Sequence, residues 1–387
     1  MKKKTALLGA SGSIGRNAAE VMRNLKDHVE PVLFSTHNNI ECLLDLKKEF
    51  PNAYCALTNN EQKEKIEGID YYGSEGLLEA IASSSAQISI NGISGAAGLL
   101  PSIAILKAGS HLALANKESI VMAGSLLFSL AKEKGLSIIP VDSEHMALFK
   151  LIHAHGRENI SEIILTASGG PFRNYSMEEL KNVIPENAMA HPTWKMGQKI
   201  SIDSASLANK GLEVIEAAHY FDLPPEKIKV SIHPQSIVHS MVKLHDGAVY
   251  AQMSKPDMKL TIHEALTWPQ THYSPFGDLD FESLTLNFEK PDFDKFPMLN
   301  LAYKSLEGNG LPCVYNAANE IAVEAFVDGR ISFLEIPSIV SYVLREELFK
   351  DDEEAKNMNL EKILIQDNKA RKYAEELIKL GAANVDF

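Results

Sequence analysis

The first part of the chain alternates short apolar runs with amphipathic stretches. Apolar runs of strand length lie at residues 5–8, 31–34, 87–91, 111–115 and 136–141. Helical patterns lie between them at 17–25, 101–108 and 120–134, the last followed by Gly135, a residue that commonly ends helices. Alternating strands and helices predict an α/β fold with a doubly wound, Rossmann-like parallel sheet, whose ligands bind beyond the carboxyl ends of the strands.

The pattern changes after residue 143. A strand is predicted at 161–166, and apolar runs at 236–244 and 248–253 flank His245-Asp246-Gly247, which is a hairpin signal. Residues 299–380 have mostly helical periodicity. We therefore expect four parts, which are an α/β domain at 1–142, an α+β domain at 143–270, a linker at 271–296 and a helical domain at 297–387.

Composition narrows the classes of function. At 387 residues, two or three domains are expected, and no apolar run approaches the length of a membrane span. The first four residues, Met-Lys-Lys-Lys, lead into a strand without the apolar core of a signal peptide, and the three cysteines have no metal-binding spacing, so we expect a cytoplasmic protein. A net charge of −13 argues against nucleic acid as a partner and requires local positive groups for any anionic substrate.

A glycine-rich turn follows the first predicted strand. Gly9, Gly12 and Gly15 stand between this strand and the next helix, where such a turn holds a pyrophosphate at the helix N-terminus. The alternative is a tight turn that needs glycine for its geometry only. The second strand ends in Ser35-Thr36-His37-Asn38, without the acidic residue that NAD-binding folds place about 20 residues past the glycines. We therefore predict a dinucleotide site that prefers NADPH.

Two carboxylates follow the strand at 136–141. Asp142 and Glu144 are one pleat period apart, so on an extended chain both would point the same way and repel each other without a cation. Oxygen ligands of this kind suit Mg²⁺ or Mn²⁺. The alternative is a strand-to-helix turn in which Asp142 or Ser143 caps the next helix. Asn116-Lys117-Glu118 follows the neighbouring strand, and parallel strands would bring both groups to one edge of the sheet.

Three further segments carry ligand-competent groups. Ser168-Gly169-Gly170 follows the strand at 161–166 and could hold a phosphate with its hydroxyl and amides. Residues 185–198 show little periodicity and are predicted as a loop, in which Trp194 either packs under the fold or closes over a ligand. Between Ser204 and Glu213 the chain offers a hydroxyl, an amide, an ammonium and a carboxylate before a helix at 214–220, or else a polar helix start capped by Ser204.

These and other motifs occur along most of the chain. They are Gly9 to Gly15, Leu114-Ala115-Asn116-Lys117-Glu118-Ser119, Pro140 to His145, Ser168-Gly169-Gly170-Pro171-Phe172, His191-Pro192, Trp194, Met196-Gly197, Asp203-Ser204, Asn209 to Glu213, His233-Pro234-Gln235-Ser236 and Asn316-Ala317-Ala318-Asn319-Glu320. In this order they resemble the 1-deoxy-D-xylulose 5-phosphate reductoisomerase family, which depends on NADPH and a divalent metal ion.

The resemblance implies a role for each matching position. Metal ligands would be Asp142, Glu144 and Glu213. Residues that bind the substrate would be Lys117, Ser143, Glu144, Ser168, His191, Ser204, Asn209, Lys210 and Glu213, and among these Lys117, Glu144 and His191 would take part in catalysis. The NADPH would be lined by Ser11, Gly12, Ser13, Ile14, Thr36, His37, Asn38, Asn116, Glu118 and Gly197. Trp194 and Met196 would belong to a flap at about 185–198 over the active site. His37 stands where the family often has Lys or Arg.

The implied reaction is the metal-dependent rearrangement and NADPH-dependent reduction of 1-deoxy-D-xylulose 5-phosphate to 2-C-methyl-D-erythritol 4-phosphate, in isoprenoid precursor biosynthesis. Mg²⁺, Mn²⁺ or Co²⁺ would serve as the metal ion, and the family suggests a homodimer without nucleic-acid or membrane partners. Two alternatives stay open. One is a metal-free NADPH dehydrogenase of the semialdehyde type, for which none of the three cysteines is suitably placed. The other is a non-catalytic NADPH-binding or regulatory paralogue.

Overall fold

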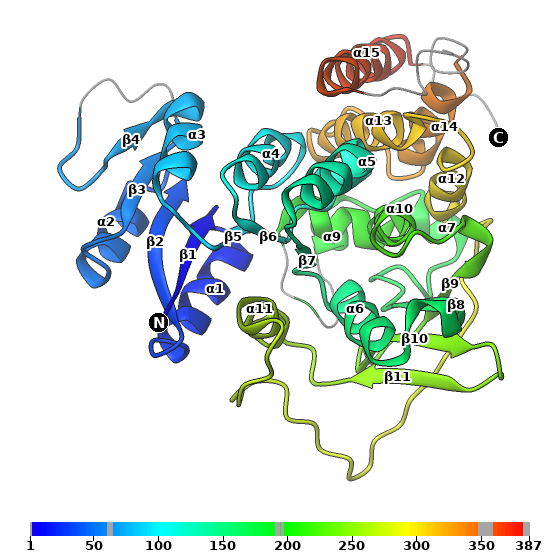
Figure 1. Cartoon of the computed structure of the whole chain (residues 1–387). Helices are drawn as coiled ribbons and strands as arrows, with labels where there is room; N and C mark the ends of the chain where they lie inside the picture. The colour runs from blue at the N-terminus through cyan, green and yellow to red at the C-terminus, as the bar shows by residue number, and fades with distance from the viewer. Residues whose placement is uncertain (1, 60–64, 190–193, 195–196, 347–358, 382–387) are drawn as a thin grey trace. The chain divides into compact units, whose positions relative to one another are not determined.

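The structure is a computed structural model, and it describes residues 2–59, 65–189, 194, 197–346 and 359–381. Figure 1 shows the whole chain, coloured by residue number. The chain divides into two compact units. The first unit contains Met1–Ser119, Leu127–Met146 and Asp257–Leu279, and the second contains Ile120–Leu126, Ala147–Pro256 and Asp280–Phe387. Among the described residues, no helix is both long and apolar enough to cross a membrane.

The first unit is built on a parallel sheet of seven strands in the order β4-β3-β2-β1-β5-β6-β7. The strands are β1 (Lys3–Leu8), β2 (Val29–Thr36), β3 (Tyr54–Leu57), β4 (Tyr71–Tyr72), β5 (Ile88–Asn91), β6 (His111–Leu114) and β7 (Ile138–Pro140). The helices of this unit are α1 (Ser13–Asn24), α2 (Ile40–Glu49), α3 (Gly73–Ser83), α4 (Leu99–Lys107) with the short 3₁₀ helix η1 (Ala96–Gly98) before it, and α11 (Met258–Thr267), which packs beside α1 (Figure 1). The predicted Rossmann-like sheet is confirmed, and its order reverses between β1 and β5.

Two helices, α5 (Lys117–Lys134) and α6 (Ser143–His155), have residues in both units. Gly135 ends α5 in the left-handed conformation at φ +66°, as the sequence predicts. The start of α6 differs from the expectation, because the helix begins at Ser143 and the chain from Asp142 to Glu144 is not extended. Asp142 Oδ1 accepts hydrogen bonds from the amides of Glu144 and His145, both at 3.1 Å. The cap at Asp142 is therefore present, and the argument from the pleat period was wrong.

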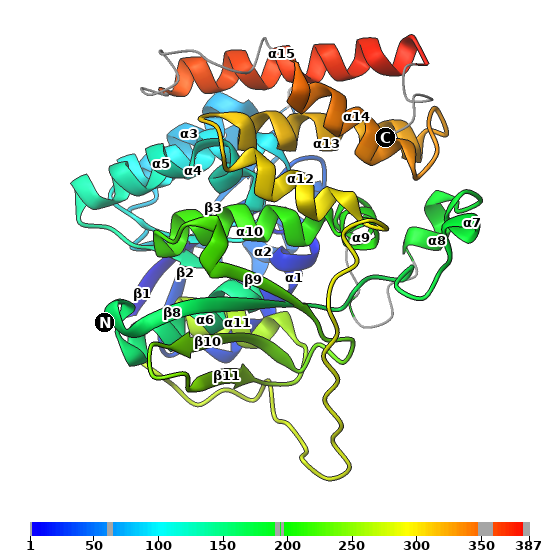
Figure 2. The same ribbon diagram turned by 90° about the vertical axis from the view of Figure 1, so that its right-hand side faces the viewer.

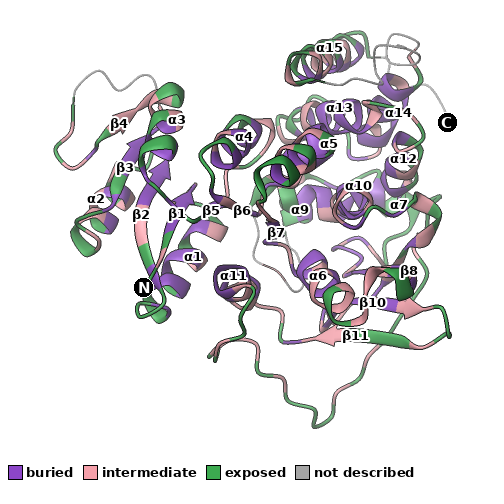
Figure 3. Cartoon of the chain, in the orientation of Figure 1, coloured by how far each residue is buried: buried purple, intermediate pink, exposed green. Residues whose placement is uncertain are grey.

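The second unit contains a four-stranded sheet in the order β11-β10-β8-β9. The strands are β8 (Ile160–Ala167), β9 (Ile228–Ile232), β10 (Val238–Leu244) and β11 (Val249–Met253). β10 pairs antiparallel with both β8 and β11, which confirms the predicted hairpin, and β8 pairs parallel with β9. β11 and β9 are the two edge strands of this order. Figure 3 shows exposed residues along β11, and Val249 and Tyr250 are among them.

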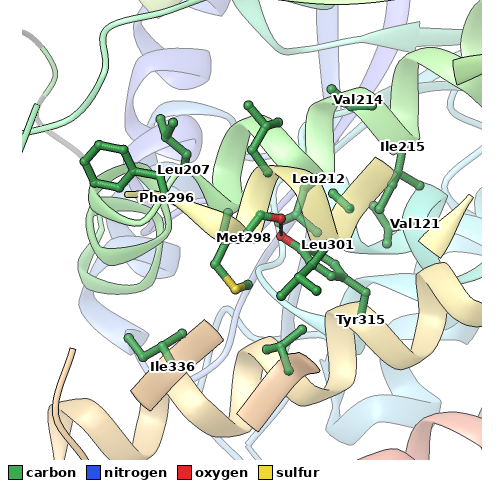
Figure 4. Close-up of a cluster of buried hydrophobic side chains, with 14 of the residues drawn as sticks. Val121, Leu207, Leu212, Val214, Ile215, Phe296, Met298, Leu301, Tyr315 and Ile336 are labelled. Carbon is green, nitrogen blue, oxygen red and sulfur yellow. Dashed lines mark hydrogen bonds between the residues drawn. The ribbon is translucent and has the colours of Figure 1, made fainter. Parts of the chain in front are cut away.

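Helices cover one face of this sheet in successive layers. They are α9 (Gln198–Ala205), α10 (Ala208–Phe221), α12 (Pro297–Ser305), α13 (Leu311–Val327), α14 (Glu335–Arg345) and α15 (Leu360–Lys379), and shorter helical turns are α7 (Met177–Leu180), α8 (Pro185–Met189), η2 (Arg157–Asn159) and η3 (Pro225–Lys227). Helix α10 packs on β9 and α12, and α13 packs against α14 and α15 (Figure 2). Most of α13 is buried (Figure 3), and its apolar residues belong to the main hydrophobic cluster of the unit (Figure 4).

The helical C-terminal part is confirmed, whereas two other boundaries were wrong. Helix α10 begins at Ala208, six residues before the predicted start at 214, and Ser204 lies inside α9 and does not cap α10. The predicted loop at 185–198 begins with the helix α8. In both places a residue with weak helix propensity or a proline hid a helix start, since Asn209 and Gly211 lie in α10 and Pro185 is the first residue of α8.

Candidate active site

The glycine turn after β1 has a geometry that only glycine can supply at two positions. Gly9 has φ +79°, and a Cβ atom added to it would lie 2.8 Å from the Gly92 carbonyl oxygen. A Cβ atom on Gly15 would lie 2.3 Å from the Gly9 carbonyl oxygen. The turn therefore closes tightly on the first residues of α1, whose N-terminus follows directly at Ser13. An N-terminus of this kind presents backbone amides and a partial positive charge, which suit a phosphate group.

The end of β2 lies next to this turn. Ser35 holds the turn through two contacts, because its carbonyl oxygen accepts from the amide of Ala10 at 2.8 Å and its Oγ accepts from the amide of Gly9 at 3.3 Å. His37 follows β2 as an exposed residue, and its Nδ1 lies 3.0 Å from Thr58 Oγ1. The order of the sheet thus places the glycine turn and the residues that would select the cofactor on neighbouring strands.

At the ends of β6 and β7, Lys117, Asp142 and His145 come together. These strands are parallel neighbours, so the groups that follow them share one edge of the sheet, as predicted. Lys117 Nζ donates to Asp142 Oδ2, and His145 Nδ1 lies 3.0 Å from Asp142 Oδ1. Ser143 Oγ donates to Glu144 Oε2. The sequence analysis did not anticipate the contact of His145, although its spacing of three residues from Asp142 could have indicated it.

Asn116 and Glu118 are buried beside this cluster. Asn116 Oδ1 accepts from the amide of Ser119 at 2.9 Å and thereby caps α5. Its Nδ2 donates to the Gly95 carbonyl oxygen at 2.9 Å and to Glu118 Oε2 at 2.8 Å. Asn116 therefore ties the start of α5 to the loop that follows β5, and both segments stand at the carboxyl edge of the sheet.

In the second unit, Glu213 is held by two residues of its own helix. Glu213 is buried, with 1% of its surface exposed, and Lys210 is 3% exposed. Lys210 Nζ donates to Glu213 Oε2, and Asn209 Nδ2 donates to Oε1 at 2.7 Å. Their spacing of three and four residues along α10 places all three on one face of the helix.

Ser168 and Ser204 also come near each other through the backbone. Gly169 and Gly170 have φ +84° and +68°, and Ser168 Oγ accepts from the amide of Gly170 at 3.2 Å. A Cβ atom on Gly170 would lie 2.6 Å from the Ser204 carbonyl oxygen, so this glycine loop rests on the end of α9. Ser168, Ser204 and Asn209 are each half-buried.

The predicted residues between 190 and 197 are described only in part. His191 and Met196 fall outside the described residues. Trp194 is half-buried and Gly197 is exposed immediately before α9. That Trp194 belongs to a flap over the active site stays a prediction.

Family models match three parts of the chain. The model described as 1-deoxy-D-xylulose 5-phosphate reductoisomerase matches residues 5–124, and those described as the C-terminal domains of this enzyme match 138–221 and 253–373. A relative from Treponema denticola named 1-deoxy-D-xylulose 5-phosphate reductoisomerase is 46% identical over 375 residues, which are 96% of each chain. The chain belongs to the 1-deoxy-D-xylulose 5-phosphate reductoisomerase family.

Solved structures of reductoisomerases agree with this assignment. The enzyme from Zymomonas mobilis in complex with NADPH is 39% identical, with a TM-score of 0.89 over 98% of this chain and 100% of that chain. A reductoisomerase in complex with NADPH, fosmidomycin and magnesium is 38% identical, with a TM-score of 0.92 over 99% of this chain and 100% of that chain. The fold and the family that the sequence motifs indicated are thus confirmed.

Proposed function

We propose that this chain catalyses the metal-dependent rearrangement of 1-deoxy-D-xylulose 5-phosphate and its NADPH-dependent reduction to 2-C-methyl-D-erythritol 4-phosphate. The observation that carries this proposal is membership in the reductoisomerase family over nearly the whole chain. The chain has carboxylates for a metal ion, a glycine turn for NADPH, and polar and basic side chains for a phosphorylated substrate.

The divalent metal ion is assigned to Asp142, Glu144 and Glu213. Their donor set fits a hard ion, because all three offer carboxylate oxygens, the ligands that Mg²⁺ and Mn²⁺ prefer. Related structures contain magnesium. When bound, the ion supplies Lewis acidity and orients neighbouring oxygens of a ketose. Physical support comes from Asp142 and Glu213, each of which already has a lysine partner and therefore stands in a place built for positive charge.

NADPH is assigned to the glycine turn and the strand ends of the first unit, where it supplies the hydride. Its pyrophosphate would lie at the N-terminus of α1, against Ser11, Gly12, Ser13 and Ile14. Thr36, His37 and Asn38 would face the ribose phosphate, since no acidic residue stands there to exclude it. Asn116, Glu118 and Gly197 complete the proposed contacts.

The substrate is assigned to the residues that the family resemblance implies. Ser168, Ser204, Asn209, Lys210 and His191 would hold the phosphate, which lies far from the reacting carbons and supplies binding energy for closure of the flap with Trp194 and Met196. Lys117 and Ser143 would contact the substrate oxygens, and the ammonium group of Lys117 would stabilise negative charge that develops on oxygen. Glu213 and Glu144 would face both the metal ion and the substrate.

We also propose an oligomeric state and a cellular location. A homodimer would extend the sheet of the second unit through its exposed edge strand β11, because an uncovered edge with apolar residues invites pairing with a second chain. Cytoplasmic location and the domain limits 1–142, 143–270 and 297–387 with a linker at 271–296 are kept as predicted. Sedimentation of the protein at several concentrations tests the dimer, and a monomer at micromolar concentration would contradict it.

The reaction is tested by following NADPH absorbance with 1-deoxy-D-xylulose 5-phosphate, first with Mg²⁺ or Mn²⁺ and then with a chelator. We expect oxidation of NADPH that stops with the chelator and returns with excess metal. Oxidation that is indifferent to the chelator would favour a metal-free dehydrogenase. Absence of oxidation with either metal, in a protein that binds NADPH, would favour a non-catalytic paralogue.

A further inference from the structure

Helix α13 directs two polar side chains toward the helices that carry the proposed phosphate ligands. Tyr315 and Asn319 are four residues apart, so they lie on the same face of the helix. Both are fully buried. The sequence motif that contains Asn319 has no role in the proposed reaction. Helices α9, α10, α12 and α13 all belong to the second unit.

Asn319 holds a buried carboxylate of α9. Asp203 is 1% exposed, and its Oδ1 accepts from Asn319 Nδ2 at 2.8 Å. Its Oδ2 accepts from Lys199 Nζ at 2.8 Å. A carboxylate this deep in the protein is stable only where donors fix its position, so Asn319 and Lys199 together fix the last turn of α9.

The next residue, Ser204, is one of the proposed phosphate ligands. Its carbonyl oxygen would be 2.6 Å from a Cβ atom on Gly170, and the loop that carries Ser168 therefore rests on it. A shift of α9 would move Ser204 directly and Ser168 through this contact. The Asp203–Asn319 hydrogen bond thus controls two of the proposed phosphate ligands.

Tyr315 contacts α10 by close packing of its hydroxyl group. Its hydroxyl donates to the Met298 carbonyl oxygen at 3.2 Å, as the dashed line in Figure 4 shows. The same hydroxyl would lie 2.8 Å from a Cβ atom on Gly211, so α10 approaches α13 as closely as a glycine permits. Gly211 follows Asn209 and Lys210, which are two further proposed phosphate ligands.

We propose that Tyr315 and Asn319 are positioning residues for the substrate phosphate, with Asn319 setting α9 and Tyr315 setting α10. The inference rests on the proposed function, because it takes the phosphate ligands from there. It adds a specific cause for their alignment, namely one face of α13 that contacts both ligand-bearing helices.

The test compares Asn319→Leu with Asn316→Leu in the full-length protein. Both changes replace a buried asparagine of α13 with a side chain of similar size, but the side chain of Asn316 donates to Glu320 of its own helix at 3.4 Å and not to the carboxylate of Asp203. For Asn319→Leu we expect the KM for 1-deoxy-D-xylulose 5-phosphate and the inhibition constant of inorganic phosphate to rise about tenfold, as the loss of a hydrogen bond to a charged group implies. The kcat and the KM for NADPH should change less than about threefold. The proposed metal ligands lie outside α9, and Gly197, the proposed NADPH contact beside α9, precedes its first turn, whereas Asn319 fixes the last turn.

A second variant keeps the test decisive if Asn319→Leu folds poorly. The exchange Asp203→Asn with Asn319→Asp keeps one amide and one carboxylate in the pair but, like Asp203→Asn alone, removes the carboxylate beside Lys199. Its substrate KM should therefore be at least about threefold lower than that of Asp203→Asn. An equal rise in KM for Asn316→Leu, or a KM of the folded exchange variant no lower than that of Asp203→Asn, would overturn the inference. Inactive wild-type protein would instead contradict the proposed function itself, so the two failures are distinguishable.

Discussion

Replacing Glu213 with glutamine tests the proposed metal site with a change of charge and almost no change of size. The change keeps the size of the side chain and the Oε1 acceptor for Asn209, and it removes the negative charge beside Lys210. Both charged groups are buried, with side-chain exposures of 3% for Lys210 and 1% for Glu213. Removing one partner of a buried ion pair costs about 3–5 kcal/mol of unfolding free energy.

For a unit of this size, each kcal/mol corresponds to a shift in Tm of about 2–4 °C. We therefore expect Tm to fall by about 6–12 °C for a loss of about 3 kcal/mol in the metal-free protein. Mg²⁺ at a hundred times its Kd should stabilise the wild type by about 2.7 kcal/mol, and it should stabilise the glutamine variant far less because one ligand has lost its charge. Thermal unfolding with and without MgCl₂ measures both effects.

The same variant should lose turnover while it keeps NADPH binding. The proposed cofactor contacts lie in other segments, so the Kd for NADPH, measured by fluorescence titration, should stay within about twofold. Glu216→Gln is the matched control, since Glu216 is a buried glutamate one turn later on the same helix and has no role in the proposed site. An equal loss of NADPH binding in Glu213→Gln, or an undiminished response to Mg²⁺, would refute the assignment.

Three further changes test other parts of the structure. Gly15→Ala places a Cβ atom 2.3 Å from a backbone oxygen and should lower the unfolding free energy by about 1–3 kcal/mol in a denaturant titration, whereas Gly12→Ala, with its nearest atom at 3.4 Å, should not. His37→Asp should raise the KM for NADPH about tenfold or more and leave the KM for NADH nearly unchanged, because a carboxylate would repel the 2′-phosphate. Burial lowers the pKa of His263, so the folded protein keeps this side chain neutral while the unfolded chain takes up a proton below about pH 6.5. Stability should thus fall as the pH drops below that value, and His263→Gln should reduce the fall in Tm between pH 7.5 and 5.5.

The sequence predicted which polar residues follow the strands of the first unit at one edge of the sheet, because this arrangement follows from the parallel topology. Once the strands are parallel, the residues after Leu8, Leu114 and Pro140 must share one edge of the sheet, and the pattern alone identifies the strands. The local conformation after these strands was harder to predict. The sequence is compatible with Asp142 and Glu144 at the end of a strand or at the start of a helix. The hydrogen bonds to the Asp142 carboxylate show that a helix starts there.

The periodicity of apolar residues could not predict which helices distant in sequence contact each other. Asp203 and Asn319 are 116 residues apart, and each is polar, so a pattern of apolar positions places both on a surface. The structure instead buries them as a pair. Tertiary packing selects the partner of each buried polar side chain, and the local sequence does not identify that partner.

The two lysines proposed as substrate ligands are each paired with a proposed metal ligand. Lys117 donates to Asp142 in the first unit, and Lys210 donates to Glu213 in the second. A metal ion bound to these carboxylates would compete for the same oxygens and turn the ammonium groups toward other anions. The substrate brings such anions as its phosphate and its polarised oxygens. Metal and substrate should therefore bind with positive coupling, because each makes the lysines or the carboxylates available to the other.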